Sequence, residues 1–132
     1  MDRIRIDDGH AARGELSVRP EAARIARGML EPVGEGVRED VLERAKLLVT
    51  EVVANSVVHG DTRDPIRVHV EARPRALRVQ VSDTGPAFEP DARRPRERSE
   101  SGWGLFLVDT LADRWGVRPS DDDVTVWFEL DL

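Results

Sequence analysis

Polar side chains recur every four residues in one otherwise apolar segment, LLVTEVVANSVVHG. If this segment is helical, Glu51, Asn55 and His59 lie along one side of it. At about 100° per residue, the apolar residues surround almost the whole helix, and Leu47 and Val58 border the polar stripe on one side. A carboxylate and an amide in such surroundings cost free energy unless they have partners. A metal ion with a bound ligand would supply those partners.

Carboxylate and amide oxygens suit Mg²⁺, which keeps several waters and binds few protein groups. The functional interpretation is that Asn55 coordinates Mg²⁺, while Glu51 handles a proton or orients a water molecule. The helix alone leaves a second interpretation open, in which the stripe is merely solvated at the edge of a core. For His59, the favourable placement of a histidine at a helix C-terminus is explanation enough.

A first glycine motif, Asp83-Thr84-Gly85, follows directly on a predicted strand and continues through Pro86 to Ala87. The acidic residue can simply start a turn. It can also accept a hydrogen bond from an exocyclic amine, with Gly85 letting a flat ring approach the backbone closely. An Asp-x-Gly sequence alone does not decide between the two.

A second motif consists of Ser101, Gly102, Trp103, Gly104 and Leu105, at the start of a predicted helix. Backbone N–H groups at a helix N-terminus, left accessible by small residues, form a natural phosphate site. The alternative is a glycine hinge before a helix. A conventional P-loop is excluded, because no Gly-Lys-Ser/Thr segment occurs in the sequence.

A segment rich in proline and arginine, residues 84–101, joins the two motifs and has no apolar period. A loop of this length inside a compact domain is uncommon and often functional. Its four arginines could neutralise phosphates, or they could simply keep the segment solvated. Neighbouring acidic residues make the second interpretation reasonable for most of them. Arg98 is nearest to the second motif and is the preferred phosphate contact.

The elements that must position these groups follow from periodicity and from turn residues. Strands are predicted around Ile4 and Ile6 and over 15–18, 66–72, 76–81 and 124–130, and helices over 21–30, 39–59 and 105–112. The coarse order is strand, helix, helix, strand, strand, loop, helix and strand. It predicts an α+β domain with its helices on one face of a mixed, mostly antiparallel sheet.

The composition excludes several classes of protein. A chain of 132 residues, 39% hydrophobic and 35% charged, suits a single globular domain over 1–132. A formal net charge of −6 argues against a direct nucleic-acid partner. The absence of cysteine excludes disulfides and thiolate zinc sites. With no recognisable signal peptide or membrane-spanning run, we expect a cytoplasmic protein without a membrane partner.

Three motifs therefore stand in one order: a helical Glu-x-x-x-Asn, a strand-end Asp-x-Gly and a Gly-x-Gly-Leu at a helix start. That order and spacing resemble the GHKL superfamily of ATP-binding domains, which includes gyrase, Hsp90, MutL and histidine kinases. The similarity covers nearly the whole chain. It is greatest for the short serine/threonine kinases that act as bacterial anti-sigma factors. It implies the two-layer Bergerat fold, with ATP or ADP and Mg²⁺ as ligands.

The resemblance also implies roles for individual residues. Glu51 would be the general base and Asn55 the Mg²⁺ ligand. Asp83 would read the adenine, with Gly85 flanking the ring. Residues 89–101 would form a lid over the phosphates.

The remaining positions concern the phosphates and the last strand. Gly102 and Gly104 would hold the phosphates, and the whole motif 101–105 would contact the nucleotide. Thr125 would support adenine binding, although an ordinary strand residue is an equally weighted alternative. Ala87 stands where many relatives have a second glycine, which could alter lid opening without abolishing nucleotide binding.

Two functions follow from the resemblance. In the first, the protein transfers the γ-phosphate of ATP to a serine or threonine of an anti-sigma-factor antagonist of the STAS type. Phosphorylation would release that antagonist, and the kinase would then hold a sigma factor. In the alternative, the protein binds ATP or ADP as a regulatory module and does no catalysis. Relatives are often homodimers, and the strand near Ile4 could contribute an interface.

Overall fold

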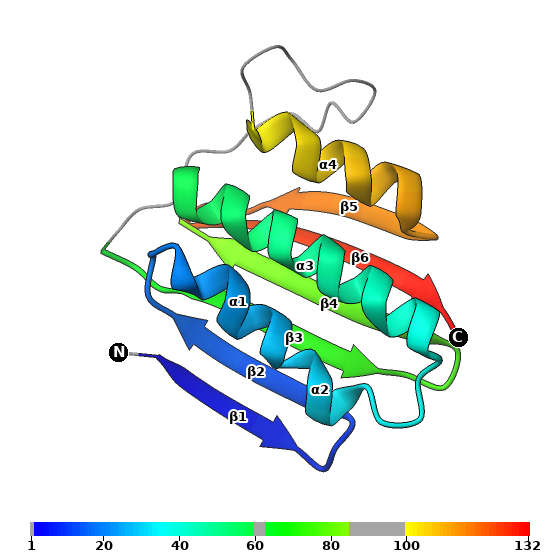
Figure 1. Cartoon of the computed structure of the whole chain (residues 1–132). Helices are drawn as coiled ribbons and strands as arrows, with labels where there is room; N and C mark the ends of the chain where they lie inside the picture. Colours follow the sequence, from blue (N-terminus) through cyan, green and yellow to red (C-terminus); the bar gives the residue numbers. More distant parts are fainter. Residues whose placement is uncertain (1, 60–62, 85–99) are drawn as a thin grey trace.

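The computed structural model consists of a six-stranded sheet with helices layered on one of its faces (Figure 1). It describes residues 2–59, 63–84 and 100–132, without the side chains of 59 and 100–104. The strands are β1 Arg3–Asp7, β2 Ala11–Leu16, β3 Ile66–Ala72, β4 Ala76–Asp83, β5 Arg114–Pro119 and β6 Val124–Asp131. The helices are α1 Glu21–Gly28, α2 Leu30–Val33, α3 Glu39–His59 and α4 Glu100–Leu111.

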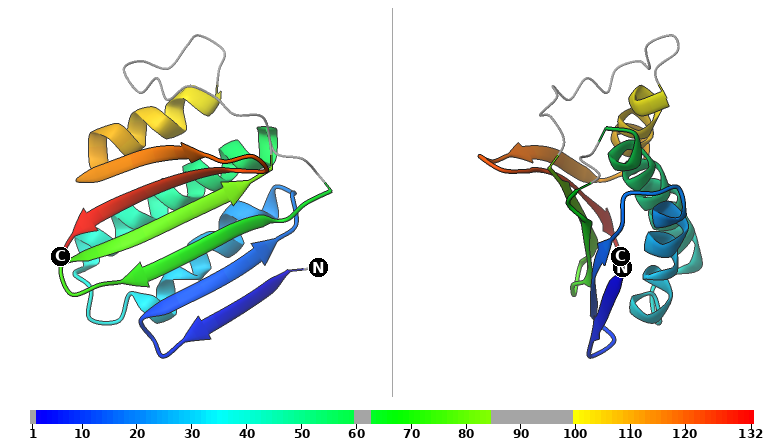
Figure 2. Two further views of the ribbon diagram at one scale, coloured as in Figure 1. Left: turned by 180° about the vertical axis from the view of Figure 1, so that it is seen from behind. Right: turned by 90° about the vertical axis from the view of Figure 1, so that its left-hand side faces the viewer.

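The layered α+β architecture is confirmed. The strand order is β1-β2-β3-β4-β6-β5, and each of these neighbouring pairs is antiparallel. The described sheet is therefore wholly antiparallel rather than mixed. Figure 2 shows the sheet and the helices as two layers, with the second sheet face uncovered. The predicted bounds of α3 and β3 agree with the structure.

The second strand begins earlier than the sequence analysis expected. β2 covers Ala11–Leu16, whereas residues 15–18 had been predicted. The reason is a tight turn in which Asp8 and Gly9 have φ of 54° and 71°, and the amide of His10 donates to the carbonyl of Asp7 at 3.1 Å. Positive φ at both central residues is the geometry of a type I′ hairpin turn, for which Asp-Gly is a strong signal. Asp8 and Gly9 carry that signal in the sequence.

β5 was missed altogether. Its sequence, RWGVRP, has no clear alternation and contains a glycine and a proline, so nothing local favours a strand. Pairing with β6 makes it one, and the indole of Trp127 lies over Gly116. A Cβ atom built on Gly116 would lie 2.7 Å from the Trp127 indole nitrogen. Contact across the sheet, rather than propensity, therefore determines this strand.

The core lies between the helices and the inner sheet face. α3 contributes Leu48, Val49, Val52 and Val53, all at most 2% exposed, and the central strands contribute alternate residues such as Val79 and Phe128. Burying each such side chain stabilises the fold by about 1.5–3 kcal/mol. α3 has 21 residues, but no helix in the described part of the chain is long and apolar enough to span a membrane.

The start of α3 is held against α2 by a polar contact and by a close approach of the backbone. Lys46, the only lysine of the chain, forms ion pairs with Glu31 of α2 and with Glu43, the latter at 3.4 Å. The pKa of Lys46 is raised, mainly because its ammonium group donates a hydrogen bond to Glu31. Between α2 and α3, the amide of Gly34 donates to the carbonyl of Leu30 at 2.7 Å.

We expect Gly34→Ala to destabilise the protein by about 1–3 kcal/mol, because overpacking forces neighbouring groups to move. A Cβ at Gly34 would lie 2.5 Å from Leu42 Cδ1 and 2.8 Å from the Leu30 carbonyl oxygen. Gly28→Ala in α1 is the matched control, since no atom lies within 4 Å of its Cβ position. Chemical denaturation measures both, and equal stabilities of the two variants would contradict the packing argument.

The face of the sheet opposite the helices carries rows of polar side chains across the strands. In the middle row, Arg5, Arg13, His69, Gln80 and Trp127 follow one another from β1 to β6. Side chains that share a row of an antiparallel sheet point to the same face and lie close enough to interact. This uncovered surface is called the open face below.

The surroundings of His69 on the open face lower its pKa. Arg118 donates to Gln80 Oε1 at 2.9 Å, which turns the amide nitrogen of Gln80 towards His69 Nδ1 at 3.4 Å. His69 Nε2 is buried and has no hydrogen-bond partner in the described part of the chain. Burial first, and the neighbouring Arg13 guanidinium second, lower the pKa of His69.

We expect the free energy of unfolding to decrease as the pH falls below the ordinary histidine pKa of 6.5. Because the pKa of His69 is lower in the folded protein than in the unfolded chain, the unfolded chain takes up the proton first. His69→Gln should flatten this decrease between about pH 7 and 5, while His10→Gln, at an exposed turn residue, should preserve it. Urea denaturation across this range tests the expectation, which fails if both variants keep the parental slope.

Candidate functional site

Four chain segments meet at one end of the two-layer structure (Figure 1). They are the last turns of α3, the end of β4, the start of β6 and the first turn of α4. α3 and α4 pack side by side and run in opposite directions, so the C-terminal end of one lies near the N-terminal end of the other. The helical Glu-x-x-x-Asn motif, the strand-end aspartate and the second glycine motif are thereby brought to the same end.

The stripe on α3 is more open to solvent than the sequence analysis expected. Glu51 and Asn55 are half-buried, but Leu47 and Val58, which border them on one side, are 43% and 63% exposed. The apolar residues therefore do not surround the helix, and one flank of the stripe faces solvent. No hydrogen bond or ion pair joins the Glu51 carboxylate to the rest of the described chain, which leaves it available to a ligand.

Asp83 is the last residue of β4 and is half-buried. It pairs in register with Val124 of β6, which is buried. By the alternation of the strand, Asp83 shares the helix-facing side of the sheet with Val81. The chain beyond it is tied to the turn before β3, because the Thr84 hydroxyl donates to Asp64 at 3.1 Å. The carboxylate therefore lies on the same side of the sheet as α3.

The structure does not bring Thr125 to the side of Asp83. Its hydroxyl lies 2.7 Å from the hydroxyl of Ser82, its cross-strand neighbour, and both belong to the open face. Val124, rather than Thr125, stands beside Asp83 on the helix-facing side. The apolar alternation of β6 through Val126 already indicated this orientation, whereas the role expected for Thr125 came from the family resemblance.

α4 begins at Glu100, five residues before its predicted start. Gly102 and Gly104 consequently lie within the beginning of the helix and not ahead of it. The first four N–H groups of a helix have no partner within the helix, so this end still presents backbone donors. The side chain of Leu105 is 5% exposed and belongs to the core, which means that it anchors the helix and does not itself reach a ligand.

Several predicted site residues lie outside the described part of the chain. These are Gly85, Ala87, Arg98 and nearly all of the lid predicted at 89–101. For Ser101 and Trp103, as for His59 on α3, the backbone is described but the side chain is not. The nucleotide contacts predicted for Gly85, Ala87, Arg98, Ser101 and Trp103 therefore stay predictions.

The oxygen donors of the site fit a magnesium ion carried by a nucleotide better than a metal bound by protein alone. The described residues contain no group of three histidine, cysteine or acidic side chains that could hold a metal. Mg²⁺ usually takes only one or two protein ligands and fills its other positions with water and substrate phosphates. One amide oxygen from Asn55 suits that mode of binding.

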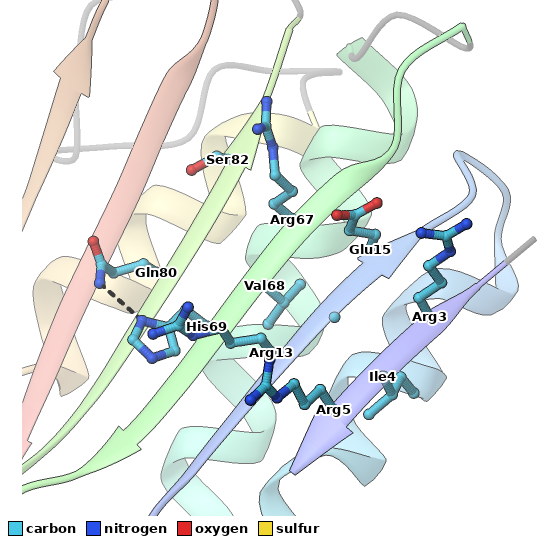
Figure 3. A pocket seen from close by; sticks show the side chains of 11 residues that line it. Arg3, Ile4, Arg5, Arg13, Glu15, Arg67, Val68, His69, Gln80 and Ser82 are labelled. Carbon is cyan, nitrogen blue, oxygen red and sulfur yellow. Dashed lines mark hydrogen bonds between the residues drawn. The ribbon is translucent and has the colours of Figure 1, made fainter. Parts of the chain in front are cut away.

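A hollow of about 600 Å³ lies elsewhere, on the open face between β1 and β4 (Figure 3). Arg3, Arg13, Arg67, His69 and Ser82 are among the residues that line it. The helices lie behind the sheet in this view, so the sheet separates the hollow from α3. Because Glu51, Asn55 and Asp83 are on the other side, the hollow is distinct from the candidate site.

Comparison with known families agrees with the motifs and the geometry. The family model described as "Histidine kinase-like ATPase domain" matches residues 16–130, which include α3, the end of β4, α4 and β6. The chain belongs to this family. The membership in the GHKL superfamily that the motifs predicted is thereby confirmed.

Curated relatives within this family are serine-protein kinases. The chain is 31% identical over 115 residues to "Serine-protein kinase RsbW" of Listeria innocua, covering 75% of this chain and 73% of that protein. It is 29% identical over 128 residues to the RsbW of Bacillus velezensis, covering 85% and 79% of the two chains. The family member described here is therefore similar to RsbW kinases over most of its length.

Solved structures show the same fold. The RsbU and RsbW domains of Rv1364c from Mycobacterium tuberculosis match with a TM-score of 0.70 and 22% identity, over 91% of this chain and 32% of that longer one. The catalytic domain of the histidine kinase ThkA matches with a TM-score of 0.57 and 16% identity, over 90% and 97% of the two chains. The two-layer arrangement is thus common to this family member and to both proteins.

We expect Thr125→Val to lower stability by about 1 kcal/mol, through loss of the hydroxyl pair with Ser82, and to leave ATP and ADP affinity unchanged. Ser82→Ala removes the same pair from the other strand and is the matched control. Calorimetric titration with nucleotide, together with thermal unfolding, measures both quantities. A fall in affinity confined to Thr125→Val would show instead that Thr125 supports the adenine.

Proposed function

We propose that this protein is an ATP-dependent serine/threonine kinase of the anti-sigma-factor type. The observation that carries the proposal is the meeting of Glu51 and Asn55 on α3 with Asp83 and the start of α4 at one end of the fold. The similarity to RsbW serine-protein kinases supports the same activity. In this proposal the nucleotide lies between α3 and α4 at the end of β4.

Each group has a role that its position allows. Asp83 accepts a hydrogen bond from the exocyclic amine of adenine, on the helix-facing side of the sheet. The backbone N–H groups at the start of α4 bind phosphate oxygens. Glu51, half-buried and open to solvent on one flank, accepts the proton of the attacking hydroxyl.

Asn55 lies one helical turn beyond Glu51, where it would hold Mg²⁺ through its amide oxygen. When bound, the ion offsets negative charge on the phosphates. The protein's own contribution to transfer is positioning: α3 fixes the base, and the sheet fixes the adenine end of the nucleotide. Both elements are anchored in the same core, which sets the distance between them.

The substrate we propose is a serine or threonine of an anti-sigma-factor antagonist, and the second partner a sigma factor. The RsbW names of the curated relatives support a serine as the acceptor. A chain in which RsbU and RsbW domains occur together supports a regulatory setting for such domains. Phosphorylation of the antagonist would free the kinase to hold the sigma factor.

We expect Glu51→Gln to lower phosphate transfer by about 100-fold or more, because a positioned general base contributes on that scale. Nucleotide affinity should change by no more than about threefold, since the base acts on the acceptor hydroxyl and not on the nucleotide. The measurement is transfer of labelled γ-phosphate to a cognate antagonist, combined with titration of ATP binding.

Glu43→Gln is the control, because Glu43 lies on the exposed surface of the same helix and undergoes the same change. It should behave like the parent protein. Transfer that persists in Glu51→Gln would remove Glu51 from the catalytic role. Absence of transfer from the parent protein, with ATP binding and partner regulation intact in Glu51→Gln, would favour the non-catalytic switch.

A further inference from the structure

The two edges of the sheet differ in how they are protected. β5 ends in Pro119, its Arg114 is bound to Glu129 and Asp131, and α4 packs beside it. Proline, charge and covering elements are the usual means of blocking an edge strand. β1 has the sequence RIRID without proline, and Figure 1 shows α1 and α2 over β2 and β3 rather than over β1. Within the described chain, no strand pairs with its outer edge.

β1 is nevertheless held in a fixed extended form. At its start, the Asp2 carboxylate accepts hydrogen bonds from the Ser17 amide at 2.8 Å and from Arg19 at 3.0 Å. At its end, the Asp8-Gly9 turn joins it to β2. An edge that is already ordered loses little conformational entropy when another strand pairs with it.

The two faces of β1 have different chemistry. Ile4 and Ile6 are 48% and 53% exposed, and they point to the helix side because their register partners in β2, Gly14 and Ala12, are buried there. Arg3 and Arg5 alternate with them and point to the open face. An exposed apolar row and an exposed basic row therefore follow one strand.

The basic row continues into the hollow of the open face (Figure 3). Arg3, Arg5, Arg13 and Arg67 line the hollow, and Glu15 is the one acidic residue among its lining residues. The protein as a whole carries a formal charge of −6, so this concentration of arginine runs against its overall charge. Guanidinium groups bind carboxylates with fitted, often bidentate geometry.

The arginines nearest the edge are only partly neutralised. Arg5 is 80% exposed and lies 2.9 Å from Asp7, whose other oxygen is 3.9 Å from Arg13. One carboxylate thus serves two guanidinium groups. Arg3 forms no ion pair with any described residue, although Glu15 is its register partner.

We propose that β1 accepts an extended strand of a partner polypeptide in which acidic and apolar residues alternate. Addition to an edge strand satisfies backbone groups, and alternate side chains then point to opposite faces. The acidic side chains would meet Arg3 and Arg5 on the open face. The apolar ones would cover Ile4 and Ile6 on the helix side.

A second copy of this chain fits the same edge less well. Antiparallel pairing centred on Arg5 would place it opposite Arg5 of the second copy, with Arg13 of each chain alongside, and would flank this central pair with two Arg3–Asp7 pairs. Like charges directly opposite one another are destabilising. An acidic strand with its carboxylates opposite Arg3 and Arg5 and none opposite Asp7 keeps the attraction and removes the central repulsion, and for that reason the edge favours a different chain.

The test uses a labelled, end-capped synthetic peptide of about seven residues in which Glu and Val alternate. Fluorescence anisotropy should detect binding that weakens with salt, and Arg5→Glu should weaken it by about tenfold or more. Hydrogen exchange of the β1 amides should slow when the peptide binds. Arg24→Glu, at an exposed position of α1, makes the same charge change away from the edge and should bind like the parent.

Two further probes separate strand addition from simple charge attraction. A peptide of the same composition with its acidic residues grouped together should bind weakly, and Ile6→Asp should reduce binding of the alternating peptide. Equal binding of both peptides, equal binding by Arg5→Glu, or no binding at all overturns the proposal. Dimerisation that Ile6→Asp abolishes would assign the edge to a second copy instead. No nucleotide is needed, so the result does not depend on the kinase proposal.

Discussion

The burial of one side of α3 against the centre of the sheet is the constraint on which the structure depends. Leu48, Val49, Val52 and Val53 leave only one rotation of the helix that removes them all from water. Each contributes about 1.5–3 kcal/mol, so rotating the helix would be far more costly than exposing or covering a few polar atoms. The positions of the polar groups on α3 follow from that rotation.

Glu51 is therefore half-buried because of its apolar neighbours and not because of a partner of its own. The side of the stripe next to the sheet is closed by the core, and the side next to Leu47 and Val58 is open. This combination fixes the backbone that carries the carboxylate while leaving the carboxylate accessible. A site placed between α3 and α4 uses both properties, since it needs fixed groups and a route for a ligand.

The sheet divides the molecule into two chemical environments through the alternation of its side chains. Asp83 and Val124 face the helices, whereas Ser82 and Thr125, one position away, face the uncovered side. The nucleotide site proposed here belongs to the first environment. The basic hollow and the arginine row of β1 belong to the second, and the edge of β1 lies at the far side of the sheet from β4 and α4, so a partner strand and a nucleotide could bind at the same time without competing for residues.

The sequence by itself determined the elements with strong periodicity, α3 and β3, and the motif residues on them, because apolar spacing in long segments reflects burial directly. It did not determine β5, whose strand conformation depends on β6 and on the contact of Trp127 with Gly116. Nor did it determine the exposure of Val58 or the pairing of the Thr125 hydroxyl with Ser82. Tertiary structure decided these, because helix rotation and strand register are set by contacts between segments far apart in the chain.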